Sequence, residues 1–208
     1  MAGLTFHSAD LKGPGQVVHT NKGATYLGEL DQSRTPRLDQ LNEWMKRAGM
    51  NPVLEEDIVA TLWGKFVLNC AINAPTAVTG LRSGEMYRTP EVNALQDRII
   101  DEILMVIERK GIRISAPDPR KKIKEHCRVR YNRPSMMQHV EQGRRTEIDA
   151  LNGALVREAR ALGIAVPYNE AIVAVVKGLE KSRRQRLHEP PIDYARREEE
   201  AEKEAKRE

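Results

Sequence analysis

Aromatic residues and cysteines are both scarce in this chain of 208 residues. With only two Phe, two Trp and five Tyr, the core has to be built from aliphatic side chains, a composition typical of packed helices. The two cysteines, Cys70 and Cys127, show no Cys-x-x-Cys spacing and lie within helical patterns. We therefore expect free thiols and a reducing, cytoplasmic compartment.

Several kinds of motif are also missing. No apolar run approaches the ~18 residues that span a bilayer, and the N-terminus has no signal-peptide pattern, so we expect no membrane partner. Neither Gly-x-Gly-x-x-Gly nor Gly-x-x-x-x-Gly-Lys-Ser/Thr occurs, so no cofactor-binding loop is predicted within the chain. The histidines show no His-Glu-x-x-His spacing, and no metal site is expected.

Charge gives little support to nucleic-acid binding. The formal net charge of +4 arises from 34 basic and 30 acidic residues in a near-balanced mixture. Basic clusters such as Arg120–Lys122 and Arg183–Arg184 have no aromatic residues among them to stack on bases. This pattern is typical of a solvated charged surface, and we expect no nucleic-acid partner.

Residues 1–33 predict a small β segment. Short β-prone runs at 4–6, 16–20 and 24–28 are separated by turn signals, the strongest of which is Gly13-Pro14-Gly15. A piece of two or three antiparallel strands is too small to be stable alone. The Gly-Pro-Gly segment predicts a turn rather than a phosphate cradle, because proline lacks the N–H that such a cradle donates.

Residues 34–182 predict a mainly α domain, a bundle of about seven helices. The expected helices carry apolar residues every three or four positions and span 36–48, 56–74, 90–110, 118–130, 136–142, 146–162 and 167–181. Hydroxyl or carboxylate N-caps precede proline at Thr35, Thr89 and Asp118, and Gly49 and Gly111 follow two of the helices as C-caps.

Two segments at or beyond the bundle have a distinct composition. The helix at 90–110 is apolar on more than one face, which favours a central position or contact with a second subunit. Residues 183–208 form a charged tail, and residues 195–208 are almost wholly Ala, Glu, Lys and Arg without an apolar stripe. We expect this tail to be frayed or disordered unless a partner holds it.

The most specific chemical pattern lies in the second helix. Lys65, Asn69 and Asn73 are spaced by four and form one polar stripe about 12 Å long on a helix that is otherwise apolar nearly all round. The stripe fits two readings equally well: a site, or a snorkelling lysine with amides that bond neighbouring helices. A desolvated lysine can act as a proton donor or form a Schiff base.

A second candidate region surrounds Ser135 and Glu147. Ser135 and Gln138 have the spacing of a capping box, and Thr146 with Asp149 resembles another. Glu147 in a first helical turn is favoured by the helix dipole without any function. The local spacing alone therefore favours helix caps over a functional site at Ser135 and Glu147.

Taken together, these motifs resemble the C-terminal domain of the ketopantoate reductase (2-dehydropantoate 2-reductase) family, a helical fold of the 6-phosphogluconate dehydrogenase C-terminal type. The resemblance covers roughly residues 3–180, including the early hairpin and Gly163–Asn169. The motifs that carry it, in order, are Lys65-x3-Asn69-x3-Asn73-Ala-Pro-Thr-Ala, Arg133-Pro134-Ser135-Met136-x-Gln138, and Gly143-x-x-Thr146-Glu147-Ile148-Asp149-x-x-Asn152-Gly153.

The resemblance implies reduction of a 2-keto acid by NADPH, in pantothenate biosynthesis. Family members use the lysine that matches Lys65 as the general acid for the carbonyl oxygen. The asparagines that match Asn69 and Asn73 line the substrate site. The serine that matches Ser135 binds the substrate carboxylate, and the glutamate that matches Glu147 holds the substrate hydroxyl.

This chain also departs from the family pattern. Where family members often have a further substrate-contacting asparagine, it has Arg82-Ser83-Gly84-Glu85. The family's Gly-rich Rossmann-type domain, which binds NADPH, precedes everything present here, so the early β segment is expected to be a remnant of it and the cofactor site largely absent. The several apolar faces of the helix at 90–110 predict a homo-oligomer, and a separate dinucleotide-binding chain is a candidate partner. The alternative function is a non-catalytic helical dimerisation or interaction module.

Overall fold

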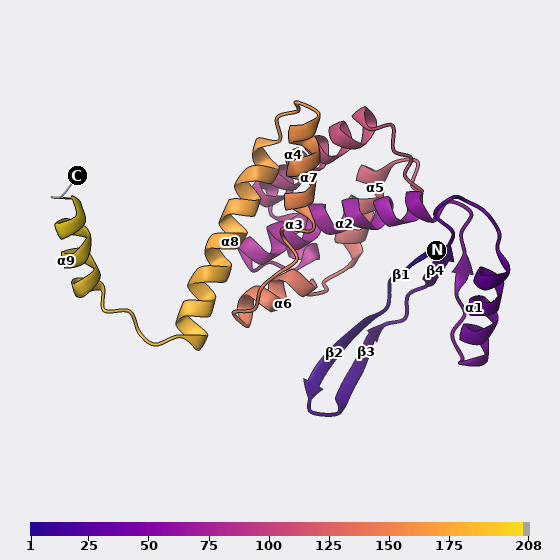
Figure 1. Ribbon diagram of the computed structural model, residues 1–208, viewed down its shortest axis with the longest axis horizontal. Helices are drawn as coiled ribbons and strands as arrows, with labels where there is room; N and C mark the ends of the chain where they lie inside the picture. The colour runs from indigo at the N-terminus through magenta and orange to yellow at the C-terminus, as the bar shows by residue number, and fades with distance from the viewer. Residues whose placement is uncertain (206–208) are drawn as a thin grey trace. The chain divides into compact units, whose positions relative to one another are not determined.

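Short strands at the start of the chain form two separate sheets in the computed structural model, which describes residues 1–205. Strand β1 (Ala2–Thr5) pairs antiparallel with β4 (Thr25–Gly28), and β5 (Val53–Leu54) lies parallel to β4 on its other side. Strands β2 (Ser8–Gly13) and β3 (Gln16–Asn21) form an antiparallel hairpin (Figure 1). Antiparallel pairing is as expected, but β2 was not among the predicted strands, and the two residues of β5 are too few to leave a sequence pattern.

Helix α1 (Pro36–Arg47) begins at a cap that is itself tied to the β segment. The Thr35 hydroxyl accepts a hydrogen bond from Leu38 N at 3.4 Å and donates one to Glu29 Oε1 at 2.5 Å. The buried Glu29 carboxylate also accepts two bonds from Arg37, at 2.7 and 2.6 Å. Hydrogen bonds from Arg37 first and Thr35 second hold the pKa of Glu29 far below its usual value.

Helix α2 (Ile58–Thr79) continues past the proline at which the sequence predicts its end. Pro75 has no N–H to donate to the carbonyl of Ala71, four residues earlier, which leaves that oxygen without its helical partner. The fully buried Gln96 donates its Nε2 to Ala71 O at 3.1 Å and fills the gap. The helix therefore runs five residues beyond the predicted boundary at 74.

The remaining helices form the larger part of the molecule, and the fold is mainly α as the sequence predicts. They are α3 (Ser83–Arg88), α4 (Pro90–Arg109), α5 (Pro119–Val129), α6 (Ser135–Glu141), α7 (Asn152–Ala161), α8 (Pro167–His188) and α9 (Tyr194–Ala205). Contacts divide the chain into two compact units, one of residues 1–68 with 107–122, the other of residues 69–106 with the described residues from 123 onward. No helix within residues 1–205 is long and apolar enough to cross a membrane.

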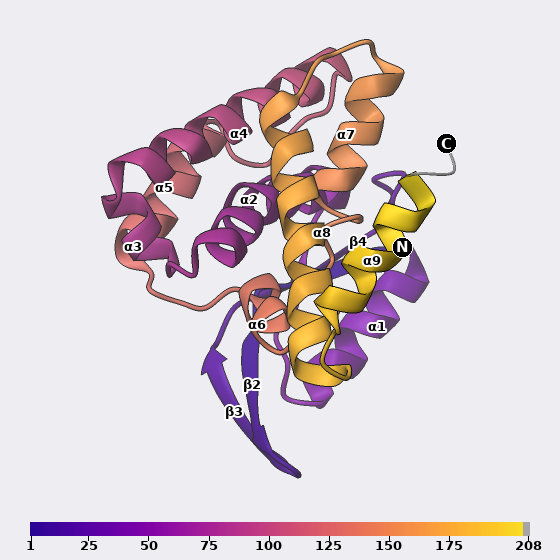
Figure 2. The same ribbon diagram turned by 90° about the vertical axis from the view of Figure 1, so that its left-hand side faces the viewer.

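The core of the second unit is centred on α4. Ile99, Ile100, Ile103 and Val106 are all fully buried, so two adjacent faces of this helix are covered within the chain, and Met105 stays 45% exposed. Helices α7 and α8 pack against each other and lie side by side in both views (Figure 2). The apolar breadth of 90–110 that the sequence shows thus corresponds largely to an intrachain core.

Several predicted caps and boundaries differ in the structure. The Asp118 carboxylate caps α5 through Lys121 N at 2.8 Å as expected, but the Thr89 hydroxyl donates to Glu85 O at 3.0 Å. The helix predicted from 146 begins at 152, because the Thr146 hydroxyl accepts from Ile148 N two residues on and forms a turn.

The C-terminal helices extend further than the sequence predicts. Helix α8 ends at His188 rather than at 181. The charged tail contains α9, where a frayed or disordered segment was expected, and none of that helix's residues is buried. Gly49 and Gly111 have φ of +79° and +64°, the left-handed conformation expected of helix C-caps.

Candidate functional site

Lys65 lies in the first half of α2 and reaches the end of strand β1. Its Nζ donates a hydrogen bond to the Thr5 carbonyl oxygen at 2.6 Å and lies 5.4 Å from the centroid of the Phe6 ring. The side chain is half-buried. A carbonyl dipole and the negative face of an aromatic ring both favour the ammonium form, so the arrangement suits a lysine that carries a proton.

An open groove borders the strand residue that holds Lys65. Thr5 lines it together with His7, His19 and Thr25, and its volume is about 690 Å³. His7 Nδ1 and His19 Nε2 are 2.9 Å apart, so the two rings form one polar wall of the groove.

The predicted polar stripe continues along α2. Asn69 is half-buried and Asn73 is 7% exposed, and the spacing of four places Lys65 and Asn73 about 12 Å apart along the helix axis. The neighbouring Cys70 is fully buried, and burial raises the pKa of its thiol. The amides therefore share the helix with an inert thiol, and Cys70 is unsuited to act as a nucleophile.

Glu147 lies on an exposed turn that is anchored to α2. Its carbonyl accepts hydrogen bonds from Ala150 N at 2.9 Å and Leu151 N at 3.0 Å, and its side chain is exposed. Directly after the turn, the buried Asn152 donates its Nδ2 to Cys70 O at 3.1 Å. This bond joins the start of α7 to α2 beside Asn69, so the turn that carries Glu147 ends next to α2.

A buried carboxylate completes this anchor. Glu102, 5% exposed on α4, accepts hydrogen bonds from Tyr168 N at 2.9 Å, Asn169 N at 2.8 Å and Asn169 Nδ2 at 2.7 Å. Asn169 Oδ1 in turn accepts from Asn152 Nδ2 at 3.0 Å. Val166, which precedes α8, has no capping side chain, so Glu102 supplies the N-cap of that helix from another element. Sequence reasoning missed this role, and the absent local cap was the signal for it.

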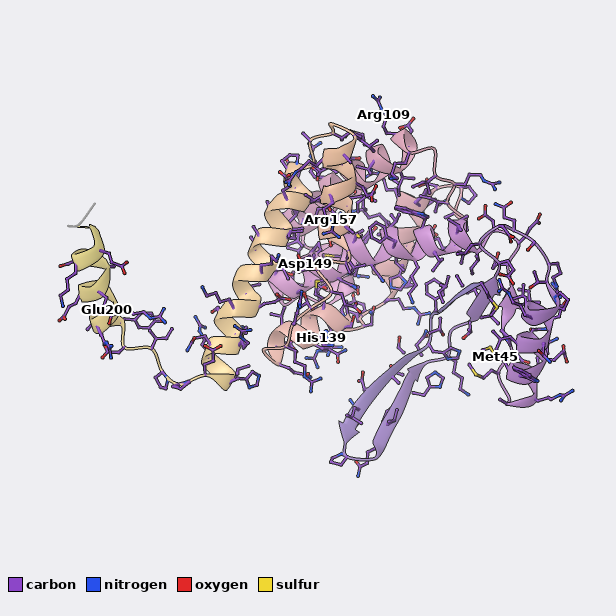
Figure 3. The ribbon with its side chains drawn as sticks, in the orientation of Figure 1. Met45, Arg109, His139, Asp149, Arg157 and Glu200 are labelled. Carbon is purple, nitrogen blue, oxygen red and sulfur yellow. The ribbon has the colours of Figure 1, made fainter. Side chains whose placement is uncertain are left out.

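The turn that follows Glu147 carries a charged cluster (Figure 3). Lys177 Nζ contacts Asp149 Oδ1 at 2.8 Å, and its hydrogen bond lowers the pKa of the Asp149 carboxyl. Arg157 Nη2 donates to Asp149 O at 3.1 Å, and Arg145 lies 3.8 Å from Asp149 Oδ2. Three cations thus surround Asp149 and hold the turn in place.

Ser135 is the first residue of α6 and is exposed. The predicted capping box is wrong, because Pro134 occupies the N-cap position and Gln138 Nε2 donates to Arg133 O at 2.9 Å instead. With Pro134 at the cap, the α6 boundary does not use the Ser135 hydroxyl. The cap interpretation of this serine therefore loses its support.

The Arg82–Glu85 segment serves as a helix start. Glu85 Oε2 accepts from Arg82 N at 2.8 Å, and the fully buried Ser83 donates its hydroxyl to Asn132 Oδ1 at 3.0 Å. Asn132 lies three residues before Ser135. The Arg82–Glu85 segment, which stands where family members often have an asparagine, thus contacts the chain just before α6.

The five predicted site residues lie on three separate parts of the fold. Lys65, Asn69 and Asn73 lie on α2, Ser135 starts α6, and Glu147 lies on the turn before α7. The anchor through Asn152 ties the turn to α2. Sequence reasoning missed the lysine's own neighbours, the Thr5 carbonyl and the Phe6 ring, because they lie about sixty residues away.

Comparison with known proteins identifies the family of this chain. The family model "Ketopantoate reductase PanE/ApbA C terminal" matches residues 57–180. A 2-dehydropantoate 2-reductase of Archaeoglobus fulgidus is 34% identical over 180 residues, which are 86% of this chain and 60% of that protein.

Solved structures also match this chain. A PanE/ApbA family ketopantoate reductase from Ralstonia eutropha JMP134 superimposes with a TM-score of 0.80 at 29% identity, covering 88% of this chain and 59% of that one. D-mandelate dehydrogenase, in its ternary structure with NADH and anilino(oxo)acetate, gives 0.75 at 25% identity, covering 86% and 59%. The chain thus spans about three fifths of the length of these relatives. It belongs to the ketopantoate reductase family, and the match lies in that family's C-terminal domain.

Proposed function

We propose that this chain is the substrate-binding and catalytic C-terminal part of an NADPH-dependent 2-dehydropantoate 2-reductase, or of a related 2-keto acid reductase. The observation that carries the proposal is Lys65, an ammonium held by the Thr5 carbonyl and the Phe6 ring at one end of a polar stripe on an apolar helix. Membership of the family supports the same reaction class.

Each residue has a distinct task in the proposed reaction. Lys65 Nζ gives its proton to the carbonyl oxygen of the keto acid as that oxygen gains negative charge. Asn69 and Asn73 supply amide donors along the same helix face, and Ser135 binds the substrate carboxylate. Glu147 accepts the hydrogen bond of the substrate hydroxyl. Reduction also needs a hydride, which NADPH supplies in this proposal.

The glycine-containing turn of the β segment does not fit the pyrophosphate of that cofactor. Gly13-Pro14-Gly15 connects β2 to β3, whereas a pyrophosphate is bound where backbone N–H groups converge at a helix N-terminus. We therefore assign no residue of this chain to NADPH and infer that a dinucleotide-binding domain, on this or a separate chain, supplies it. We also propose that the helical domain associates with a second copy of itself.

The test is NADPH oxidation with ketopantoate, measured with and without an added dinucleotide-binding domain from a family member. We expect turnover only with that domain present, and light scattering of the same mixtures reports the assembly. Turnover by the chain alone would contradict the assignment of the cofactor to another domain. A non-catalytic interaction module, the alternative function, would remain inactive in both mixtures.

Variants of the restored enzyme separate the roles. Lys65→Ala should lower kcat by about 10² or more, the usual scale for loss of a general acid. Ser135→Ala and Glu147→Gln should mainly raise KM, because each removes hydrogen bonds worth about 1–3 kcal/mol. Lys46→Ala, at an exposed lysine paired with Glu43 on α1, is the matched control and should leave turnover unchanged. Unchanged activity in Lys65→Ala would refute the catalytic assignment.

A further inference from the structure

The ammonium of Lys65 is held by two consecutive residues of one strand end. Thr5 offers its carbonyl oxygen at 2.6 Å, and Phe6 offers its ring, whose centroid is 5.4 Å from Nζ. A cation within about 6 Å of an aromatic ring is attracted to its face, and the attraction grows when water is partly excluded. Lys65 is half-buried, so both contacts act on a partly desolvated charge.

Phe6 is itself fixed from several directions. Its N–H donates to Ala24 O at 2.9 Å, and its carbonyl accepts from Asn21 Nδ2 at 2.9 Å. A Cβ on Gly23 would come within 2.3 Å of the Phe6 backbone, so only glycine allows this close approach. The Tyr26 ring meets the Phe6 ring edge to face at a centroid distance of 5.9 Å. The backbone and ring of Phe6 therefore form a rigid support.

We propose that Phe6 is a positioning residue for Lys65: its ring holds the lysine ammonium, the proposed proton donor, against the Thr5 carbonyl. Phe6 acts through Lys65 and carries no proton itself. The inference rests on the proposed function only for the use of that proton. The contact between the Phe6 ring and Lys65, and its effect on the reactivity of the lysine, involve only residues of this chain.

The chain offers a matched control, because it contains only two phenylalanines. Phe66 follows Lys65 directly on α2, and its ring packs edge to face against Trp63 at 5.1 Å. Phe6→Leu and Phe66→Leu are thus the same chemical change, one at the ring over the ammonium and one beside it in sequence.

The experiment measures how fast acetic anhydride acetylates Lys65 in the full chain at a series of pH values, by mass spectrometry of the peptide that contains it. Only the neutral amine reacts, so the midpoint of the rate curve reports loss of the ammonium proton. We expect Phe6→Leu to move that midpoint down by about half a pH unit or more, since the ring no longer favours the charged form. Phe66→Leu should leave the midpoint in place, and Phe6→Tyr, which keeps a ring, should restore it.

Equal curves for Phe6→Leu and the unchanged chain would overturn the positioning role, as would an equal shift in Phe66→Leu. Circular dichroism checks the fold of each variant. If Phe6→Leu is unfolded, Phe6→Met, a flexible apolar replacement, takes its place with the same expected and opposing results. The labelling needs no turnover, so loss of the proposed function would show in the activity of Lys65→Ala and would leave these curves unaffected.

Discussion

Ala71 has a backbone carbonyl that its own helix cannot satisfy, because the residue four positions later is Pro75. Gln96 Nε2 donates to that oxygen at 3.1 Å and also lies 3.5 Å from the Cys127 sulfur. The other end of the amide, Gln96 Oε1, is buried and has no hydrogen-bond partner among the described residues. The side chain therefore stabilises α2 mainly through its one bond to Ala71.

A double-mutant cycle isolates this bond. Gln96→Met leaves the Ala71 carbonyl unsatisfied in the native background, whereas Pro75→Ala returns the helical N–H and supplies a second donor. We expect Gln96→Met to cost about 1 kcal/mol less in the Pro75→Ala background, the net value of one hydrogen bond. Urea denaturation of the four proteins measures this. Additive effects, within about 0.5 kcal/mol, would mean that the amide does not substitute for the missing donor.

At this scale, sequence spacing could predict residues on one helix but not their distant partners. The interval of four between Lys65, Asn69 and Asn73 fixes a common helix face from local geometry alone. The Thr5 carbonyl and the Phe6 ring are set by tertiary pairing, which leaves no local signal. The Ser135 cap failed for the opposite reason, since Pro134 fits the extended N-cap conformation and displaced the expected serine.

Helix ends show the same division between local and tertiary control. α1 begins at Pro36, directly after its predicted cap Thr35, because the Thr35 hydroxyl accepts from the nearby Leu38 N. α2 overruns its predicted end, since Gln96 compensates for Pro75 from another helix. α7 begins six residues later than predicted, because the side chain of Thr146 closes a turn in competition with the helix. The start of α1 was therefore predictable from its own cap, whereas the end of α2 depends on a partner from another helix and the start of α7 on a local turn that competes with the helix.

Helix α5 contains a histidine whose titration opposes folding in mild acid. Burial first, and the nearby Arg130 charge second, lower the pKa of His126 below its ordinary value. At pH values between the ordinary pKa of histidine and the lowered pKa of His126, this side chain is protonated in the unfolded chain and neutral in the native chain. The free energy of unfolding must therefore fall as the pH drops from about 7.5 toward 5.

His126→Gln should remove this contribution and flatten the pH dependence of stability. The melting temperature, followed by circular dichroism at pH 7.5, 6.5 and 5.5, should fall less in the variant than in the unchanged chain. Glu29 and Asp149 have lowered pKa values, so their contributions are lost only at more acidic pH, outside this window. Parallel curves for the two proteins would assign the acid sensitivity to other groups.

The whole chain consists of two compact units with a helix common to both. Composition and periodicity predicted a mainly α fold, because few aromatics and regular apolar spacing leave little else. They could not predict that α2 contributes Ile58–Leu68 to one unit and Asn69–Thr79 to the other. That division follows from which residues lie together in space, and the predicted boundary at 33 stays a prediction.

The end of the chain divides into a docked part and an undocked part. Within the docked part, His188 Nε2 lies 2.7 Å from Gln142 O, and a Cβ added at Gly143 would lie 3.0 Å from the His188 ring. Beyond it, α9 has no buried residue and Tyr194 is 67% exposed. Among the described residues beyond α8, Glu189 and Pro190 bond back to Arg184 and Gln185 on that helix, and α9 buries none of its residues.

Two truncations test this division by their melting temperatures. Removal of residues 190–208 should leave the melting temperature within about 2 °C, because almost no apolar area is lost. Removal of residues 183–208 also deletes His188 and the last turns of α8, and it should lower the melting temperature by several degrees, since a difference of about 1 kcal/mol corresponds to about 2–4 °C at this chain length. A drop of 5 °C or more on the shorter truncation would show that the tail docks on the body.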